Sequence, residues 1–221
     1  IYIIQDADLM NAHAQNSLLK FLEEPHPDIY ALLLTQDGSK LLPTIRSRTQ
    51  TIPFKRLPSI VIERHLENEG YERKLARLAS QLTTNLDAAE AFVNEPWLYS
   101  FIDGIESLYQ ALVNGESLIL KWREVEKDLM IVPENMQDFI DILIYYQKDV
   151  IYGKMNYYKK IIFEDAIDLL NSVASLKTKA MLIADLEHML ALKVKLNHYI
   201  NTDLAFDNLM LALERRNQSE E

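Results

Sequence analysis

The chain contains no cysteine, and only five of its 221 residues are glycine. The absence of cysteine excludes disulfide bonds and metal sites built from thiolates. The phosphate-binding pattern G-x-x-x-x-G-K-[ST] does not occur, and no glycine-rich loop could surround phosphates with backbone amides. The five histidines also lack the spacing of metal ligands. The sequence therefore predicts neither a bound cofactor nor a metal ion.

Basic residues are outnumbered by acidic ones, and the net charge is −10. A protein that grips DNA through many phosphates needs a cationic face, which this balance argues against. One cluster at residues 154–160 mixes lysines with tyrosines and could contact nucleic acid. The interpretation that we favour is that its tyrosines pack and its lysines are solvated. No apolar run approaches twenty residues, so we expect no membrane span.

The first fifty residues follow a strand, helix, strand pattern. The β-branched and aromatic run at residues 1–4 is typical of a fully buried strand. An amphipathic helix capped by Asn11 follows, and Pro25 ends it. A second apolar strand is expected at 30–35, and a short helix that begins with proline at 42–46. Short connections between these elements predict a parallel α/β layer.

The remaining residues are expected to be helical. The first three helices are predicted at 60–68, 72–81 and 86–94. Longer amphipathic segments follow from 97 to 216, and those at 139–151 and 179–196 are apolar on one face. The expected boundaries between the longer segments are Asn114-Gly115, Pro133, Gly153 and the polar stretch 171–178. With 48% hydrophobic residues, the chain can bury a core in two or three domains.

Three runs of the first fifty residues carry a family resemblance. They are IYIIQDADLMNAHAQNSLLKFLEEP, LLLT and LLPTIRSRTQ. Together they resemble the second half of the AAA+ module in bacterial DNA polymerase III clamp-loader subunits, most closely the delta-prime type. The resemblance implies that roughly a hundred residues of the family's module precede this sequence, so the absence of a phosphate-binding loop here does not establish its absence from the whole protein. An AAA+ domain without them would leave one apolar sheet edge uncovered.

The resemblance also implies a domain order. We expect a partial AAA+ α/β domain at 1–55, a helical lid at 56–96 and a helical collar at 97–217, followed by a polar tail at 218–221. The fold class is thus multidomain and mostly helical, with one parallel sheet. Residues 197–211 look like the end of the collar, where an asparagine-rich turn leads into the last helix.

Departures from the family pattern indicate that this subunit does not hydrolyse ATP. Hydrolysing relatives end the first strand in an Asp-Glu pair, which holds Mg²⁺ and polarises water. Gln5 and Asp6 occupy those places here, and a neutral amide is a poor ligand for Mg²⁺. The shorter Asp6 carboxylate would also be misplaced. Thr35, or Gln36, takes the sensor position, and the arginine of the lid aligns near Leu86.

The acidic residues after the first strand have two interpretations. Asp6 and Asp8 could bind a divalent metal, although such a site normally needs further ligands or a phosphate. We favour the other interpretation, in which they cap the following helix and complement its positive end.

Arg48 is the strongest candidate for a functional residue. In the family, the arginine of the Ser-Arg-Cys motif reaches into the ATP site of a neighbouring motor subunit as an arginine finger. Ser47 and Thr49 take the other two positions and are expected to orient the turn. Arg46 is a weaker candidate. The alternative is that Arg48 is an ordinary surface arginine paired with a carboxylate.

The resemblance therefore implies a subunit that is not an enzyme by itself and completes a neighbour's ATP site in DNA replication. Its implied partners are motor subunits of the gamma/tau type and a delta subunit in a hetero-pentamer. A sliding clamp and primed DNA would be reached through that assembly, in the cytoplasm. Two alternatives stay open: an ATP-hydrolysing motor subunit, and a structural helical adaptor.

Overall fold

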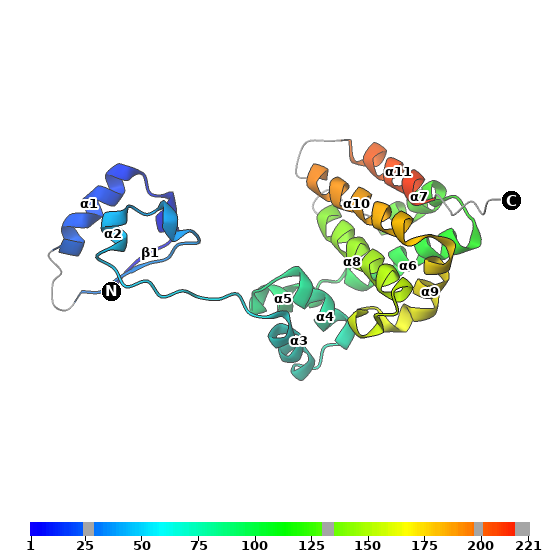
Figure 1. The fold of residues 1–221 in the computed structure, drawn as a ribbon, viewed down its shortest axis with the longest axis horizontal. Coiled ribbons are helices and arrows are strands. Elements are labelled where there is room, and N and C mark those ends of the chain that lie inside the picture. Colours follow the sequence, from blue (N-terminus) through cyan, green and yellow to red (C-terminus); the bar gives the residue numbers. More distant parts are fainter. Residues whose placement is uncertain (24–28, 130–134, 197–200, 215–221) are drawn as a thin grey trace. The chain divides into compact units, whose positions relative to one another are not determined.

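The computed structural model describes residues 1–23, 29–129, 135–196 and 201–214. The chain divides into two compact units, Ile1–Lys55 (unit 1) and Arg56–Glu221 (unit 2). Figure 1 shows a small sheet with short helices in unit 1, whereas the regular elements in the described part of unit 2 are helices. This confirms the predicted fold class, mostly helical with a partial α/β domain.

The sheet of unit 1 joins β1 (Tyr2–Ile4) to β2 (Ala31–Leu33). The strands run parallel, and Ile3 lies opposite Leu32. Parallel neighbours need a crossover connection, and α1 (Ala12–Glu23) supplies it here. The prediction of a parallel α/β layer from residues 1–35 is therefore confirmed.

The prediction that β1 is fully buried was wrong. Tyr2 is 58% exposed and Ile3 is 61% exposed. In the described part of unit 1 the sheet has two strands. The ring of Tyr2 on β1 packs against the ring of Phe21 on α1, with the ring centroids 5.7 Å apart. An apolar strand is buried only when other layers cover both of its faces.

The helices of unit 1 begin where the local sequence predicts. The side chain of Asn11 accepts a hydrogen bond from the amide of Ala14 (2.9 Å), which caps α1. The second α-helix, α2 (Pro43–Arg46), starts with proline at a position where its missing N–H leaves no bond unmade. A 3-10 turn, η2 (Gly38–Lys40), precedes it.

Unit 2 begins with three short helices, near the positions that the sequence predicted. They are α3 (Ser59–Asn68), α4 (Arg73–Leu82) and α5 (Leu86–Val93). Gly70 ends the turn after α3 with a φ of 93°, a conformation that residues with a side chain rarely adopt. The helices that follow in the described part are α6 (Leu98–Asn114), α7 (Leu118–Asp128), α8 (Met136–Lys154), α9 (Ile167–Leu176), α10 (Lys179–Leu196) and α11 (Thr202–Leu213).

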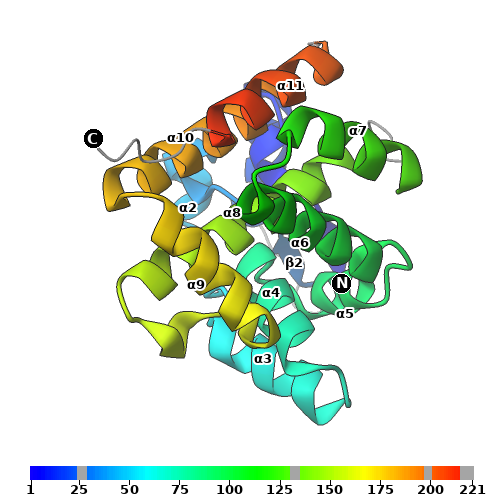
Figure 2. The same cartoon turned by 90° about the vertical axis from the view of Figure 1, so that its right-hand side faces the viewer.

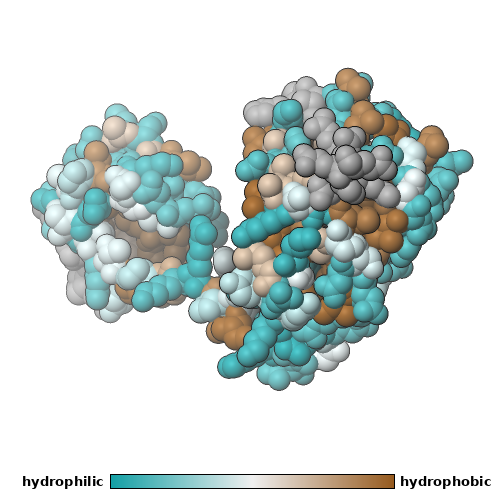
Figure 3. All heavy atoms as spheres, turned by 45° about the vertical axis from the view of Figure 1, so that its right-hand side comes forward, coloured by the Kyte–Doolittle hydropathy of each residue, from teal (hydrophilic) through white to brown (hydrophobic). Residues whose placement is uncertain are grey.

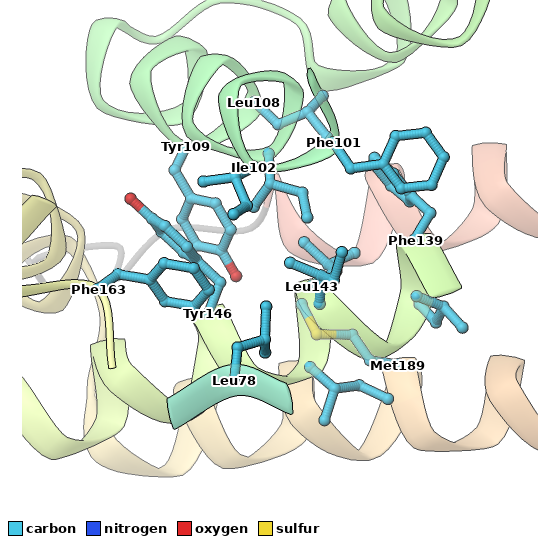
Figure 4. Close-up of a cluster of buried hydrophobic side chains, with 14 of the residues drawn as sticks. Leu78, Phe101, Ile102, Leu108, Tyr109, Phe139, Leu143, Tyr146, Phe163 and Met189 are labelled. Atoms are coloured by element: carbon cyan, nitrogen blue, oxygen red, sulfur yellow. The ribbon is translucent and has the colours of Figure 1, made fainter. Parts of the chain in front are cut away.

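One apolar core runs through unit 2, with α8 at its centre. Helix α8 packs against α6, α9 and α10, while α11 packs against α7 and α10 (Figure 2). Figure 4 shows side chains from several helices meeting in this core, among them Phe101, Phe139, Tyr146 and Met189. All four are less than 2% exposed. The buried amphipathic faces thus account for the folding of unit 2.

The predicted boundary at Gly153 is confirmed, because α8 ends at the next residue, Lys154. The predicted boundary over the polar stretch 171–178 was wrong for most of its length, because the stretch is helical up to Leu176, the last residue of α9. The hydroxyl groups of Ser172 and Ser175 bond carbonyl groups of their own helix, so the polar residues do not interrupt it. Buried Leu170 supplies part of the apolar face.

The first three helices of unit 2 are tied to the later ones by polar contacts. The Arg77 guanidinium on α4 contacts Glu63 (3.0 Å) and the carbonyl group of Ile161 (2.8 Å). Lys74 pairs with Asp165 at 2.6 Å. The predicted division of 56–221 into lid and collar stays a prediction.

The end of unit 2 is only partly described. The predicted boundary at Pro133, most of the asparagine-rich turn and the tail at 218–221 lie outside the described residues. Asn201 caps α11 by accepting a hydrogen bond from the amide of Leu204 (3.0 Å). None of the described helices has the length and apolar character that a bilayer span requires.

Candidate functional site

Arg48 lies in the turn that directly follows α2. Its backbone amide bonds the carbonyl group of Ile45 (3.0 Å). The neighbouring hydroxyl groups bond the last carbonyls of the helix, Ser47 to Thr44 at 3.1 Å and Thr49 to Ile45 at 3.0 Å. The last carbonyls of a helix lack the usual amide partners, and here the two hydroxyls add to the bond that the Arg48 amide already makes to Ile45. Arg48 therefore lies in a short turn whose backbone is held by local hydrogen bonds.

The Arg48 side chain makes two contacts within unit 1. Its Nη1 donates to the carbonyl of Thr44 (3.2 Å), and its Nη2 lies 3.1 Å from Oε1 of Glu23. The side chain is 39% exposed, so solvent still reaches the guanidinium. Arg46 is also exposed, and its side chain makes no hydrogen bond or ion pair with any residue that the structure describes, although its amide bonds the carbonyl of Leu42 (3.2 Å). Of the two candidate arginines, only Arg48 has a fixed partner in the described part.

A buried glutamine anchors this turn to α1. Gln15 accepts a hydrogen bond from the amide of Leu42 (2.7 Å), the residue that precedes α2. Its side-chain nitrogen donates to the carbonyl of Met10 (3.0 Å) and, at 3.4 Å, to that of Lys40. Gln15 was not among the residues that the sequence predicted to be functional. The sequence does contain one indication of this role, because Gln15 lies on the same face of the helix as the apolar Leu18. A polar side chain that is buried on such a face must find hydrogen-bond partners.

Gln5 and Asp6, at the end of β1, are both exposed. Asp6 has a φ of 49°, in the left-handed region that aspartate tolerates better than most residues. It precedes the 3-10 turn η1 (Ala7–Leu9), and its side chain caps nothing there. The predicted degenerate acidic pair is thus solvent-accessible in the described part of unit 1.

Asp8 joins the two strand ends rather than capping α1. Its carboxylate accepts a hydrogen bond from the hydroxyl of Thr35 (3.0 Å) and lies 3.8 Å from the Lys40 ammonium group. The predicted cap by Asp6 and Asp8 was therefore wrong, because Asn11 stands closer to the first amides of the helix. The predicted sensor-like Thr35 contacts the residues that follow β1.

The loop after Thr35 is organised by one carboxylate. The hydroxyl oxygen of Thr35 accepts a hydrogen bond from the amide of Asp37 (3.1 Å). Asp37 in turn accepts bonds from both the side chain and the amide of Ser39, and these bonds lower the pKa of the Asp37 carboxyl. The loop that leads to α2 is thus held by local hydrogen bonds. The described residues contain no group of three or more acidic, histidine or cysteine side chains placed to hold a metal.

Leu86, where the family arginine of the lid aligns, is the first residue of α5. It is partly buried against the core of unit 2, and Asn85 caps the helix through the amide of Ala88 (3.1 Å). A leucine packed in this way has no group that could reach a phosphate.

The cluster at residues 154–160 agrees only in part with the interpretation that we favoured. Its lysines, Lys154, Lys159 and Lys160, are exposed as expected. The expectation that its tyrosines pack was wrong, because Tyr157 and Tyr158 are 53% and 43% exposed. Asn156 has a φ of 58° at the end of α8, where the chain turns and carries the two tyrosines onto the surface.

Two family models match this chain. Residues 1–58 match the model described as DNA polymerase III, delta subunit, and residues 129–215 match DNA polymerase III, delta subunit, C terminal. The first match contains the Arg48 turn, and the second contains α8 to α11.

Subunits of bacterial DNA polymerase III are also similar to this chain in sequence. The chain is 31% identical over 220 residues to the DNA polymerase III subunit delta' of Bacillus subtilis, which covers 97% of this chain and 65% of that protein. It is 36% identical over 74 residues to the gamma/tau subunit of Mycobacterium bovis, covering 32% and 13%. It is 31% identical over 119 residues to the tau subunit of Escherichia coli, covering 54% and 17%.

The chain thus spans 65% of the length of the Bacillus subtilis relative and much less of the gamma/tau and tau relatives. The matches agree with the motifs of the first fifty residues and extend the likeness through unit 2. The chain is thus similar to DNA polymerase III delta subunits at residues 1–58 and 129–215, and to a delta-prime subunit over almost its whole length.

Proposed function

We propose that this chain is part of a delta-prime subunit of a bacterial clamp loader, which does not hydrolyse ATP and supplies Arg48 to the ATP site of a neighbouring motor subunit. The observation that carries the proposal is the placement of a partly exposed guanidinium on a short, closed turn. Negative charge spreads over the γ-phosphate oxygens during transfer, and a planar guanidinium can stabilise it with two parallel donors. Lysine offers a single point charge and would replace it poorly.

The residues after β1 support the proposal that the subunit does not hydrolyse ATP itself. Gln5 supplies no anionic ligand for Mg²⁺, and Asp6 is exposed with an unusual backbone conformation. The Asp8 carboxylate already contacts the Thr35 hydroxyl and the Lys40 ammonium group, and these contacts compete with binding of a metal ion. The described strand end thus lacks the acidic pair that polarises water in hydrolysing relatives.

The outer surface of unit 2 supports assembly with other subunits. Ile183, Leu190 and Val194 lie on one side of α10, since they are seven and four residues apart, and they are 39%, 44% and 62% exposed. On α11, Leu204 and Leu211 are 59% and 51% exposed. Figure 3 shows apolar residues among hydrophilic ones at the surface of the larger unit. Such stripes suit helix packing in a collar, so we propose gamma/tau-type and delta subunits as the partners in a hetero-pentamer.

Each alternative function has an observation in its favour. Similarity to gamma/tau and tau subunits over 32% and 54% of the chain favours an ATP-hydrolysing motor subunit. The ion pair between Arg48 and Glu23 favours a structural adaptor, in which Arg48 only joins α2 to α1. Neither alternative explains both the altered acidic pair and the position of Arg48 in the matched motif.

The experiment compares ATP hydrolysis by the reconstituted assembly, with DNA and clamp present, for the full-length protein and its Arg48→Ala variant. The motor subunits carry substitutions of their own finger arginines, so that turnover depends on the interface made by this chain. We expect a loss that approaches the roughly 10³-fold of GTPase fingers, with normal incorporation.

Arg46→Ala tests the weaker candidate and removes the same charge two residues away, from a side chain without a described partner. If Arg48 alone is the finger, Arg46→Ala should leave the rate unchanged. An unchanged rate in Arg48→Ala would favour the adaptor, whereas ATP turnover by the isolated full-length protein would favour the motor subunit.

A further inference from the structure

The partner of Arg48 within its own unit is Glu23, the last residue of α1. The two side chains are 39% and 50% exposed, and the distance from Nη2 to Oε1 is 3.1 Å. Among the residues that the structure describes, no other cation lies within ion-pair distance of the Glu23 carboxylate. The pair connects the carboxyl end of α1 to the turn after α2.

The position of Glu23 makes this pairing favourable for a second reason. The carboxyl end of a helix carries partial negative charge, so an acidic residue there is unfavourable and a nearby cation is favourable. Arg48 therefore meets both the carboxylate and the negative end of α1. Lys20 also lies in the last turn of α1, and it makes no ion pair with any described residue. The helix end thus has a specific cation, and that cation is Arg48.

The two contacts of Arg48 involve both terminal nitrogens of its guanidinium. Nη1 donates to the Thr44 carbonyl, and Nη2 faces Glu23. Bidentate binding of a phosphate requires two parallel N–H donors of the guanidinium. A phosphate that uses the Nη2 edge therefore competes with the Glu23 carboxylate, whose negative charge also repels it.

We infer that Glu23 is a positioning residue that holds Arg48 in a withdrawn state until the neighbouring ATP site closes on it. This inference rests on the proposed function of Arg48 as a finger. In the absence of DNA and clamp, the ion pair holds the guanidinium away from the phosphate. When DNA and clamp bind and the interface closes, the phosphate replaces the carboxylate as the partner of Arg48. Glu23 therefore lowers hydrolysis in the absence of DNA and clamp more than it lowers stimulated hydrolysis.

The size of the effect follows from the exposure of the pair. Exposed ion pairs change an equilibrium by at most about fivefold. We therefore expect Glu23→Gln to raise ATP hydrolysis without DNA and clamp by about two- to fivefold, while the stimulated rate changes less. The variant keeps the side-chain length and removes only the charge.

The test uses the full-length protein in the assembly described above, with four variants: Glu23→Gln, Arg48→Ala, the double variant, and Glu69→Gln as the matched control. Glu69 is exposed at the end of α3 and makes no ion pair within the described residues. We expect Glu69→Gln to behave as wild type and the double variant to match Arg48→Ala. Equal incorporation and equal thermal midpoints show that folding is unchanged.

The outcomes separate the two proposals. If Arg48→Ala loses activity while Glu23→Gln leaves the unstimulated rate unchanged or lowers it, the inference about Glu23 is wrong and the finger stands. If Arg48→Ala keeps its full rate, the proposed function fails, and the role of Glu23 fails with it. A rise in the rate of the double variant above that of Arg48→Ala would also overturn the inference, because Glu23 would then act without Arg48.

Discussion

Unit 1 and unit 2 bury their apolar residues to very different extents. In unit 1 the strand residues Tyr2, Ile3 and Leu32 are 58%, 61% and 48% exposed, and Ile45 is one of few fully buried side chains. Unit 2 has a continuous core that draws on every α-helix from α3 to α11. The candidate functional residues nevertheless lie in unit 1.

This difference indicates how each unit is held together. Burial of apolar surface stabilises unit 2, since each buried aliphatic or aromatic side chain contributes about 1.5–3 kcal/mol. Unit 1 depends more on directed hydrogen bonds, such as those that Gln15 makes to Leu42 and Met10. A unit held in this way can position an exposed arginine precisely enough for binding while it contributes little to the stability of the chain.

The largest effect is expected from Phe139→Ala in unit 2. Phe139 is fully buried on α8, and its ring lies 5.3 Å from those of Phe101 and Trp122. Removing it leaves a cavity that we expect to lower the free energy of unfolding by about 3–5 kcal/mol. Denaturant unfolding followed by circular dichroism and tryptophan fluorescence measures it, because both tryptophans, Trp97 and Trp122, lie in unit 2.

The matched control for this prediction is Phe54→Ala at the end of unit 1. Phe54 is 92% exposed, so the same truncation should change the free energy of unfolding by less than about 0.5 kcal/mol. If both variants lost the same free energy of unfolding, the exposed fractions of Phe139 and Phe54 would not reflect how these side chains pack in the folded protein.

A smaller, pH-dependent effect is expected at Asp149 in the core of unit 2. Burial raises the pKa of this carboxyl to about 6, although the amides of Phe163 and Ile162 and the charge of Arg77 lower it. Because the pKa is higher in the folded state than in the unfolded state, ionisation of Asp149 favours unfolding. The protonated carboxyl therefore contributes to the free energy of unfolding below about pH 4, and this contribution is lost as the pH rises through 6. With about 1.4 kcal/mol for each pKa unit, the loss is about 3 kcal/mol.

Asp149→Asn tests this, because asparagine can still accept the bonds from the two amides (2.9 and 2.7 Å) but does not titrate. Unfolding measured between pH 4 and pH 7 should show wild type losing stability relative to the variant as the pH rises. Asp103→Asn on the exposed side of α6 controls for the loss of one charge. A difference between wild type and Asp149→Asn that stays constant with pH would contradict the prediction.

The sequence predicted the helices of unit 2 better than the surroundings of the strands. Helical periodicity and the stop at Gly70 placed α3 to α5 near their observed bounds, since these signals act within one helix. The burial of β1 depends on layers that residues 1–4 do not encode, so the pattern alone overestimated it. The polar stretch after Asn171 was misjudged because serine hydroxyls can bond within a helix.

The candidate site could be predicted in part. A motif match pointed to Arg48, Ser47 and Thr49, and the roles of all three stay predictions. Glu23 and Gln15 could not be assigned in the same way, because a contact between α1 and the turn after α2 appears only when the helix direction and the loop path are known. The acidic residues were misassigned, since a carboxylate such as Asp8 can serve either a helix end or a neighbouring strand end.

The smallest effect is expected from Ile3→Ala at the centre of β1. Ile3 is 61% exposed, so little apolar contact is lost, and the weaker strand preference of alanine costs under about 1 kcal/mol. Hydrogen exchange of the amides of Tyr2 and Leu34, which bond across the two strands at 2.8 and 2.9 Å, measures the local opening of unit 1. A loss above about 2 kcal/mol in the full-length protein would mean that Ile3 is buried there by a contact outside the described residues, because a truncation this costly requires a packed environment. The contrast between the two units would then reflect a missing cover over the strands rather than an intrinsically open sheet.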